Sequence, residues 1–224
     1  GQPPPVMAAR IHRLVADETG VDDPYCDDKR RSNILALGLV EELSAALARA
    51  GDRFDVAVRL AIAGNIIDFG VHDTISLADV RQSIRHALSA DLGPGSIDDL
   101  RAAVATADTV LYLADNAGEI VLDRFLLEEI GCERITYAVK SRPIINDATV
   151  ADVSEAEFPA ALDVVETGSG TPGTYLEDCS ASFRELFYGS NLIIAKGQAN
   201  FETLSEVAVP AFFLLRVKCP VVAG

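Results

Sequence analysis

Residues 110–114 form an apolar run, Val-Leu-Tyr-Leu-Ala, that ends abruptly at Asp115, Asn116 and Gly118. A short run of this kind is typical of a strand that is buried on both faces of a sheet. The segment that follows, residues 120–130, changes to a helical period. Open α/β sheets bind their ligands at turns of this kind, where a strand leads into a helix.

The second half of the chain repeats this alternation of strand and helix. Helices and strands alternate in the predicted order of helix 96–105, strand 109–114, helix 118–130, strand 134–139, helix 149–157, strand 162–166, helix 176–187, strand 191–195, helix 201–206 and strand 211–217. Such alternation predicts a parallel sheet with right-handed crossovers. The first half contains only helical patterns, at 6–19, 29–50, 54–63 and 76–88, and residues 92–95 form a breaker cluster. We therefore expect an α/β fold with a helical domain, residues 1–95, before a sheet domain, residues 96–224.

Composition excludes two classes of partner. A net charge of −15 argues against nucleic acid and against an anionic membrane surface, because both require a basic face. The longest apolar segments, such as residues 207–217, reach about half of the roughly 20 residues that a membrane span requires. The four cysteines occur singly, without CxxC spacing, and we expect reduced thiols in a cytoplasmic protein. Residues 1–5 and 221–224 resemble cut edges, so we expect a fragment, and nothing in the sequence indicates an oligomeric state.

Three polar clusters follow predicted strands, at residues 115–119, 142–149 and 196–200. Because parallel strands end at the same edge of a sheet, we expect these clusters to form one site. Carboxylate and carboxamide oxygens suit a hard divalent cation such as Mg²⁺ or Mn²⁺, which takes further ligands from a substrate phosphate. Lys196 would then face the phosphate as a point charge.

Each cluster also has a plainer explanation. Asp115 and Asn116 before a glycine are common in helix caps, and Thr149 with Asp152 would form a capping box. Lys196 could lie in an ordinary loop, and only the coincidence of all three clusters at strand ends favours a site. Asn65 and Asp68 share a face if their segment stays helical, and the plainer explanation for them is a polar stripe on a half-exposed helix. The three histidines have no spacing that suggests catalysis.

Residues 168–173, Gly-Ser-Gly-Thr-Pro-Gly, match the G-x-G-x-x-G motif of dinucleotide- and S-adenosylmethionine-binding proteins. The motif follows the third predicted strand rather than the first, and Pro172 interrupts its turn. The next helical pattern begins only near residue 176. We interpret the motif as a flexible loop over the site.

The combined motifs are Gly-Asn-Ile-Ile-Asp at 64–68, Asp-Asn-Ala-Gly-Glu at 115–119, Pro-x-x-Asn-Asp-Ala-Thr at 143–149 and Lys-Gly-Gln-x-Asn-Phe-Glu at 196–202. In this combination the chain resembles the domain of unknown function 89 family, the metal-dependent damage-control phosphatases, and in particular their archaeal and bacterial branch. The resemblance extends over nearly the whole chain. It implies a Rossmann-like, three-layer parallel-sheet domain preceded by an all-helical domain.

By this resemblance, Asp115, Asn116 and Asp147 match the metal ligands of the family, and Lys196 matches its phosphate-contacting lysine. The other expected site residues are Glu119 as a catalytic residue, and Ala117, Gly118, Asn65, Asp68 and Asn146 as residues that bind phosphate or substrate. Two features depart from the family pattern. The CxxC region found near the N-terminus of bacterial members is absent, and Asn191 stands where many relatives have Asp.

The resemblance implies hydrolysis of phosphate monoesters of small metabolites, such as sugar phosphates or damaged metabolites, supported by Mn²⁺, Co²⁺, Ni²⁺ or Mg²⁺. We expect the metal to bind a phosphoryl oxygen, while Lys196 and the backbone amides of Ala117 and Gly118 hold the others. The nucleophile is either a water activated by the metal or Asp115 itself. The water is favoured, because Ala117 stands where aspartate phosphatases commonly have a second Asp.

Two other classes of function stay open. An S-adenosylmethionine-dependent carboxyl methyltransferase would bind its cofactor around residues 168–173. A non-catalytic protein would bind metal and phosphometabolite without turnover.

Overall fold

The computed structural model describes residues 4–65, 77–90, 92 and 97–216. The predicted site residue Asp68 lies outside the described residues. So do Ser76, the first residue of the helix predicted at 76–88, and Cys219, one of the four cysteines. Cys26, Cys132 and Cys179 are free thiols.

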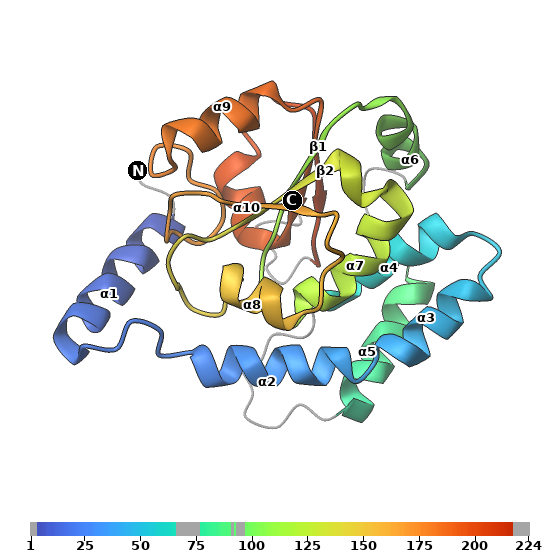
Figure 1. The fold of residues 1–224 in the computed structure, drawn as a ribbon, viewed down its shortest axis with the longest axis horizontal. Coiled ribbons are helices and arrows are strands. Elements are labelled where there is room, and N and C mark those ends of the chain that lie inside the picture. The colour runs from blue at the N-terminus through green and yellow to red at the C-terminus, as the bar shows by residue number, and fades with distance from the viewer. Residues whose placement is uncertain (1–3, 66–76, 91, 93–96, 217–224) are drawn as a thin grey trace.

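Five parallel strands form the sheet in the described part of the chain (Figure 1). They are β1 (Val110–Leu113), β2 (Ile135–Val139), β3 (Asp163–Glu166), β4 (Leu192–Lys196) and β5 (Ala211–Leu214), and they lie in the order β3-β2-β1-β4-β5. The central strand pairs with both neighbours, so that Val110 lies opposite Ile135 on one side and Leu192 on the other. The predicted parallel sheet and the α/β class are confirmed.

Helices cover both faces of this sheet. All four residues of β1 are buried, and successive side chains of a strand point to opposite faces. Val110 and Tyr112 belong to a core that also contains α7 (Glu119–Ile130), whereas Leu111 and Leu113 belong to a second core with α9 (Ala181–Gly189) and α10 (Gly197–Leu204). The sheet is therefore the middle of three layers.

The remaining helices of the second half are α6 (Ile97–Thr106), the short 3-10 helix η1 (Cys132–Arg134) and α8 (Val150–Glu155). The predicted capping box opens α8, where Asp152 Oδ2 accepts hydrogen bonds from the backbone amide and the hydroxyl of Thr149, at 2.8 and 2.7 Å. Helix α9 begins later than predicted because Ser180 caps it by accepting a hydrogen bond from the amide of Phe183. Helix α10 begins directly after β4 rather than at residue 201.

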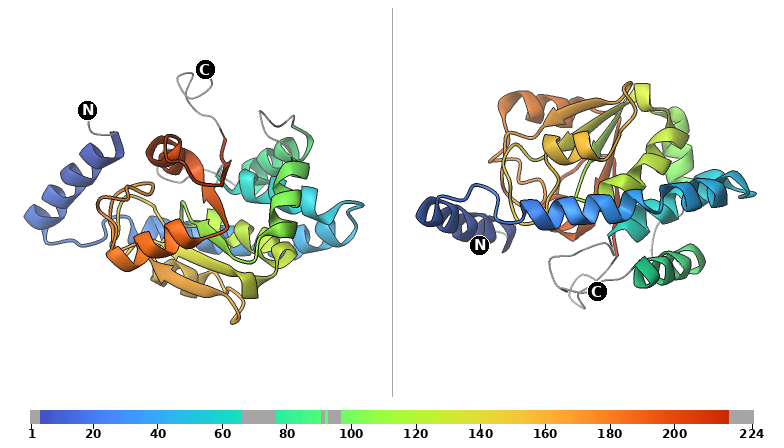
Figure 2. Two further views of the ribbon diagram at one scale, coloured as in Figure 1. Left: turned by 90° about the horizontal axis from the view of Figure 1, so that it is seen from above. Right: turned by 60° about the horizontal axis from the view of Figure 1, so that its bottom comes forward.

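The first half is helical, as predicted, with α1 (Pro4–Thr19), α2 (Cys26–Leu37), α3 (Val40–Ala48), α4 (Arg53–Gly64) and α5 (Leu77–Ser89). The single helix predicted at 29–50 is wrong, because the chain turns at Gly38 and at Leu39, which is fully buried. Helix α4 packs extensively on α7, and one core joins Leu60, Val121 and Tyr112. Figure 2 shows α1 standing apart from the other helices. Because the core is shared, the division at residue 95 stays a prediction.

Candidate active site

The three polar clusters lie at the carboxyl ends of neighbouring strands. Residues 115–118 follow β1, residues 140–149 follow β2, and Gly197 follows β4 without an intervening loop. The chain passes from β1 to β2 and later returns to place β4 on the opposite side of β1, so the direction of winding reverses there. Ligands of α/β proteins bind in the crevice at such reversal points.

Backbone hydrogen bonds join the first two clusters. The amide of Ala117 donates to the carbonyl of Asn146 at 2.9 Å, and the amide of Ala148 donates to the carbonyl of Asp115 at 2.8 Å. Between them, residues 116 and 147 form an isolated antiparallel bridge. The side chains of Asp115, Asn116 and Asp147 are all buried, with 7, 8 and 4% of their residue surfaces exposed. The structure thus brings the three predicted metal ligands together.

The carboxylate of Asp115 is held by two amide groups. Its Oδ2 accepts hydrogen bonds from Asn65 Nδ2 at 2.9 Å and from Asn116 Nδ2 at 2.8 Å. Burial, followed by the negative charges of Glu119 and Asp147, raises the pKa of Asp115 well above its ordinary value. A cation beside these groups would oppose that shift, because it favours the ionised forms.

Lys196 lies under the site, enclosed by acidic side chains. Its Nζ forms ion pairs with Glu119 Oε1 at 2.7 Å and with Asp123 Oδ1 at 2.6 Å, and all three side chains are fully buried. Burial acts to lower the pKa of Lys196, but Asp123 and Glu119 outweigh it and raise that pKa. The ammonium predicted to face phosphate is therefore anchored to two carboxylates.

Asp123 is a residue that the sequence interpretation missed. Beyond Lys196, it accepts hydrogen bonds from the hydroxyls of Tyr112 and Tyr137, at 2.8 and 2.9 Å. Burial, and then the charge of Asp123, raises the pKa of both tyrosines well above the usual value, so both hydroxyls stay protonated. The sequence contained one signal for Asp123. It lies four residues after Glu119, so that both acids share one face of a helix whose other inward positions are apolar.

The backbone amides expected to hold phosphate oxygens are already used within the chain. Ala117 donates to Asn146, as described above, and the amide of Gly118 donates to Asn33 Oδ1 on α2 at 2.7 Å. Gly118 has a φ of 77°, and a Cβ at this position would lie 2.8 Å from the Cβ of Ser32. Helix α2 therefore packs directly on the turn and takes the hydrogen bond that the prediction gave to substrate. The expectation that the amides of Ala117 and Gly118 hold phosphoryl oxygens is therefore corrected, because in this conformation both amides donate to groups of the chain itself.

Lys140, at the end of β2, is a second residue that was missed. Its Nζ lies 3.5 Å from Asp147 Oδ2, an ion pair without hydrogen-bond geometry, and donates a hydrogen bond to the carbonyl of Gly173. Burial raises the pKa of Asp147 to about 6, although Lys140 opposes this shift. Lys140 therefore links Asp147, a predicted metal ligand, to the glycine-rich loop.

The donor set fits a divalent cation, although no group of three or more His, Cys, Asp or Glu side chains is arranged to hold a metal in the described ranges. The predicted set of ligands includes the side-chain amide of Asn116, and asparagine is not among those four residue types. Asn65 Oδ1 and Asp147 Oδ2 are buried oxygens without a hydrogen-bond partner in the described part of the chain. The described residues include five buried acidic side chains, of Asp115, Glu119, Asp123, Asp147 and Asp152, and three buried lysines, Lys29, Lys140 and Lys196, so the buried acidic groups outnumber the basic ones by two. A divalent cation would balance that excess.

The full chain, residues 1–224, matches the damage-control phosphatase ARMT1-like domain. The chain belongs to this family of phosphatases. A damage-control phosphatase of Archaeoglobus fulgidus is 37% identical over 223 residues, which cover 97% of this chain and 76% of that protein. A damage-control phosphatase of Pyrococcus horikoshii is 39% identical over 208 residues, covering 91% of this chain and 71% of that one.

A crystal structure of a DUF89 family protein from Pyrococcus horikoshii has the same fold, with a TM-score of 0.85 at 37% identity. The match covers 96% of this chain and 75% of that one. The resemblance drawn from the motifs is confirmed. As a member of the family the chain is a phosphatase, and damage-control phosphatases depend on a metal ion.

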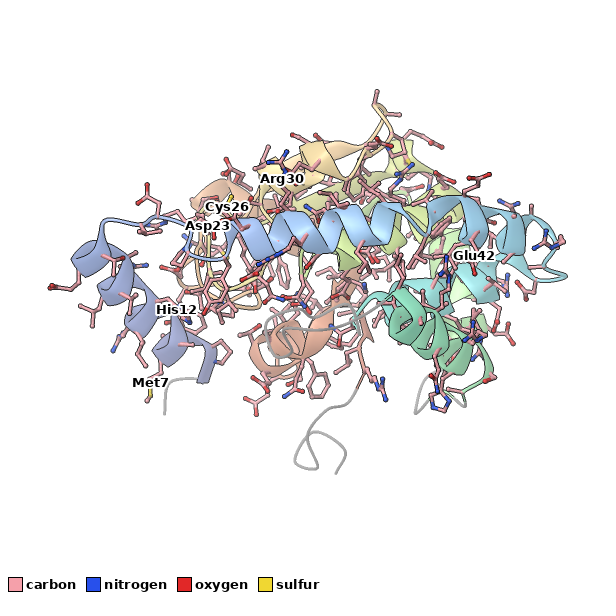
Figure 3. All side chains as sticks on the ribbon, turned by 90° about the horizontal axis from the view of Figure 1, so that it is seen from below. Met7, His12, Asp23, Cys26, Arg30 and Glu42 are labelled. Carbon is pink, nitrogen blue, oxygen red and sulfur yellow. The ribbon has the colours of Figure 1, made fainter. Side chains whose placement is uncertain are left out.

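In this damage-control phosphatase, a cavity of about 420 Å³ is lined by residues of α1, by the segment before α2 and by residues 142–145. Figure 3 shows two of its lining residues, His12 on α1 and Asp23 before α2. Ile145 also lines it and has a φ of 47°, which is strained for a β-branched residue. None of the predicted metal ligands lines this cavity, but its lining residues 142–145 lead directly into Asn146 and Asp147.

The glycine-rich loop, residues 168–173, is packed rather than flexible, which corrects the expectation. The hydroxyls of Ser169 and Thr171 both donate to Asp178 Oδ2, at 2.6 and 3.0 Å, and both residues are buried. A Cβ at Gly173 would lie 2.2 Å from the carbonyl oxygen of Ala199. The loop thus fits closely against α10, next to the phosphatase site.

Among the residues that the structure describes, none of the helices combines the length and apolar character needed to span a bilayer.

Proposed function

We propose that this damage-control phosphatase hydrolyses phosphate monoesters of small metabolites with a divalent cation held by Asp115, Asn116 and Asp147. One observation carries the proposal. Buried oxygen ligands meet at the reversal point of the sheet, where buried acidic side chains outnumber buried lysines by two and where Asp147 Oδ2 has no hydrogen bond within the described residues. Burying charge without compensation is costly, and a bound cation removes that cost.

When bound, the cation supplies charge neutralisation for the phosphoryl group. Lys196 adds a fixed positive charge below it. An ammonium group has three N–H donors, and two of them are directed to Glu119 and Asp123. We assign the third to a phosphoryl oxygen of the substrate.

A water molecule is the nucleophile in this proposal, rather than Asp115. Oδ2 of Asp115 already accepts two hydrogen bonds, from Asn65 and Asn116, and it lies against the backbone of Gly197. Hydrogen bonds of this kind stabilise the carboxylate and make its oxygen a weaker nucleophile. Asp115 therefore serves as a ligand whose orientation is fixed by its neighbours.

Phosphate release from p-nitrophenyl phosphate tests the ligand assignment. Wild-type protein, stripped of metal, is assayed with Mn²⁺, Co²⁺, Ni²⁺ and Mg²⁺ in turn, beside Asp147→Asn and Asp163→Asn. We expect Asp147→Asn to lose metal-dependent turnover with an unchanged circular dichroism spectrum. Asp163 is an exposed residue of β3, and its variant controls for a changed charge away from the site. Full activity of Asp147→Asn would contradict the proposal.

The substrate class is proposed as sugar phosphates or damaged phosphorylated metabolites. A panel of such monoesters, assayed with the preferred metal, ranks them by kcat/KM. If the protein hydrolyses p-nitrophenyl phosphate but no metabolite in the panel, the proposed substrate class is wrong, and the proposed hydrolysis of phosphate monoesters is still supported.

A further inference from the structure

The amide group of Asn65, directly after α4, has a fixed orientation in the site. Its Nδ2 lies 2.9 Å from Asp115 Oδ2 and 3.1 Å from Glu119 Oε2. When both carboxylates are ionised, as a bound cation favours, their oxygens only accept hydrogen bonds, so the atom between them is the NH₂ group. The other atom of the amide is therefore the oxygen, Oδ1.

This amide oxygen is buried and has no hydrogen-bond partner within the described residues. Asn65 itself is 2% exposed, and leaving a buried acceptor without a partner is unfavourable because the group has lost its hydrogen bonds to water. An amide oxygen can bind a cation or a hydrogen-bond donor, whereas the oxygens of a phosphate dianion are themselves acceptors. The free atom of Asn65 therefore suits a metal ion and does not suit phosphate.

Glu119 orients a second amide in the same manner. Its Oε2 accepts hydrogen bonds from Asn116 Nδ2 at 3.2 Å as well as from Asn65. Asn116 Nδ2 also donates to Asp115 Oδ2. Both NH₂ groups are thus tied to the same two carboxylate oxygens, which directs both amide oxygens away from those carboxylates.

The position of Glu119 is itself fixed from below. Its Oε1 pairs with Lys196, and Lys196 pairs with Asp123, which holds the hydroxyls of Tyr112 and Tyr137. All of these side chains are fully buried. A continuous set of hydrogen bonds therefore runs from the middle of the sheet to the two amides.

We propose that Asn65 is a fourth oxygen ligand of the cation, and that Glu119 is a positioning residue that turns the amide oxygens of Asn65 and Asn116 toward it. The inference rests on the proposed function, because it requires a cation at Asp115, Asn116 and Asp147. Hard divalent cations take amide and carboxylate oxygens together, and loss of an orienting partner typically costs about 10–100-fold in metal affinity.

Titration calorimetry of Mn²⁺ into metal-free protein, with no phosphate present, tests this assignment. We expect Asn65→Ala and Glu119→Gln each to weaken Mn²⁺ binding by about 10–100-fold. Asn191→Ala is the matched control, because Asn191 lies at the opposite end of β4 and hydrogen-bonds Thr109, and it should bind as wild type. Glu119→Gln keeps the test valid if Asn65→Ala does not fold.

The outcomes separate this inference from the proposed function. If Asp147→Asn loses Mn²⁺ binding but Asn65→Ala and Glu119→Gln bind within twofold of wild type, the inference is overturned and the function stands. An unchanged Mn²⁺ affinity of Asn65→Ala with a raised KM for p-nitrophenyl phosphate would make Asn65 a substrate residue, which also overturns it. If Asp147→Asn binds Mn²⁺ as wild type does, the proposed ligand set itself is wrong.

Discussion

Gly197 and Asp115 are packed so closely that a Cβ on residue 197 would lie 1.9 Å from Oδ2 of Asp115. Residue 197 also has a φ of 80°, a conformation that glycine adopts at little cost. Steric exclusion and backbone conformation therefore both require glycine here. Gly197, the first residue of α10, and Asp115, two residues beyond the end of β1, determine each other's position across the reversal point of the sheet.

Gly197→Ala should displace Asp115 and reduce metal-dependent kcat/KM for p-nitrophenyl phosphate by about 100-fold or more, since a shift of about 1 Å at a catalytic group has that effect. Gly189→Ala is the control, because a Cβ there meets no atom within 4 Å. It should retain wild-type kinetics. Equal activity of the two variants would show that the position of Asp115 does not matter.

Lys196→Met should destabilise the protein by about 3–5 kcal/mol, because it leaves Glu119 and Asp123 buried without a positive partner. The measurement is urea unfolding of the metal-free protein at pH 7. Glu42→Gln, which breaks the exposed pair with Arg81, should cost less than about 1 kcal/mol. A similarly small effect at residue 196 would contradict the described network.

Asp123 should make stability depend on pH. Burial raises its pKa to about 6, although Lys196 opposes the increase. Its carboxyl titrates near pH 4 in an unfolded chain, so the native state binds this proton more tightly. The contribution of Asp123 to the free energy of unfolding is therefore greatest at low pH and falls as the pH rises from about 4 to 6.

Asp123→Asn removes this titration. In urea unfolding of metal-free protein from pH 4 to pH 8, the free energy of unfolding of the variant, minus that of wild type, should rise up to about pH 6 and then level off. A difference that stays constant throughout, or that falls, would show that Asp123 is not held in the buried state described.

We predict that the backbone of Ile145, which lines the cavity next to Asn146, is strained for the sake of function. Its φ of 47° is costly for a β-branched residue, whereas asparagine tolerates this region. Ile145→Asn should leave the free energy of unfolding unchanged or raise it by up to about 1 kcal/mol, while increasing KM. Glu157 has a φ of 54° on the surface, and Glu157→Asn should stabilise similarly without a kinetic effect. A clear loss of stability in Ile145→Asn would argue against strain.

The sequence predicted the fold well where one physical signal dominated. The apolar run before Asp115 identified a central strand, and the alternation of strands with helices identified a parallel sheet. It failed where tertiary packing decided the outcome. The apolar residues keep a helical spacing through Gly38 and Leu39. The hydrophobic pattern therefore did not predict the turn that separates α2 from α3.

The site was predictable only in part for the same reason. Asp115 interrupts an apolar pattern just beyond the end of β1, and Asp147 lies in the loop that follows β2, where polar residues indicate a ligand site. Tyr112 instead occupies an ordinary strand position and Lys140 directly follows a strand, and nothing local shows that Tyr112 binds a buried carboxylate. The hydrogen bond from the Gly118 amide to Asn33 forms because α2 packs against this turn, and no sequence motif predicts that packing.

The most direct test of the account is to locate the metal. Crystals of the protein with Mn²⁺ should show an anomalous difference peak in contact with oxygens of Asp115, Asn116 and Asp147, at about 2.0–2.6 Å, the range for oxygen ligands of hard divalent cations. A peak at another site, or none at these residues under conditions where the enzyme releases phosphate, would contradict the account.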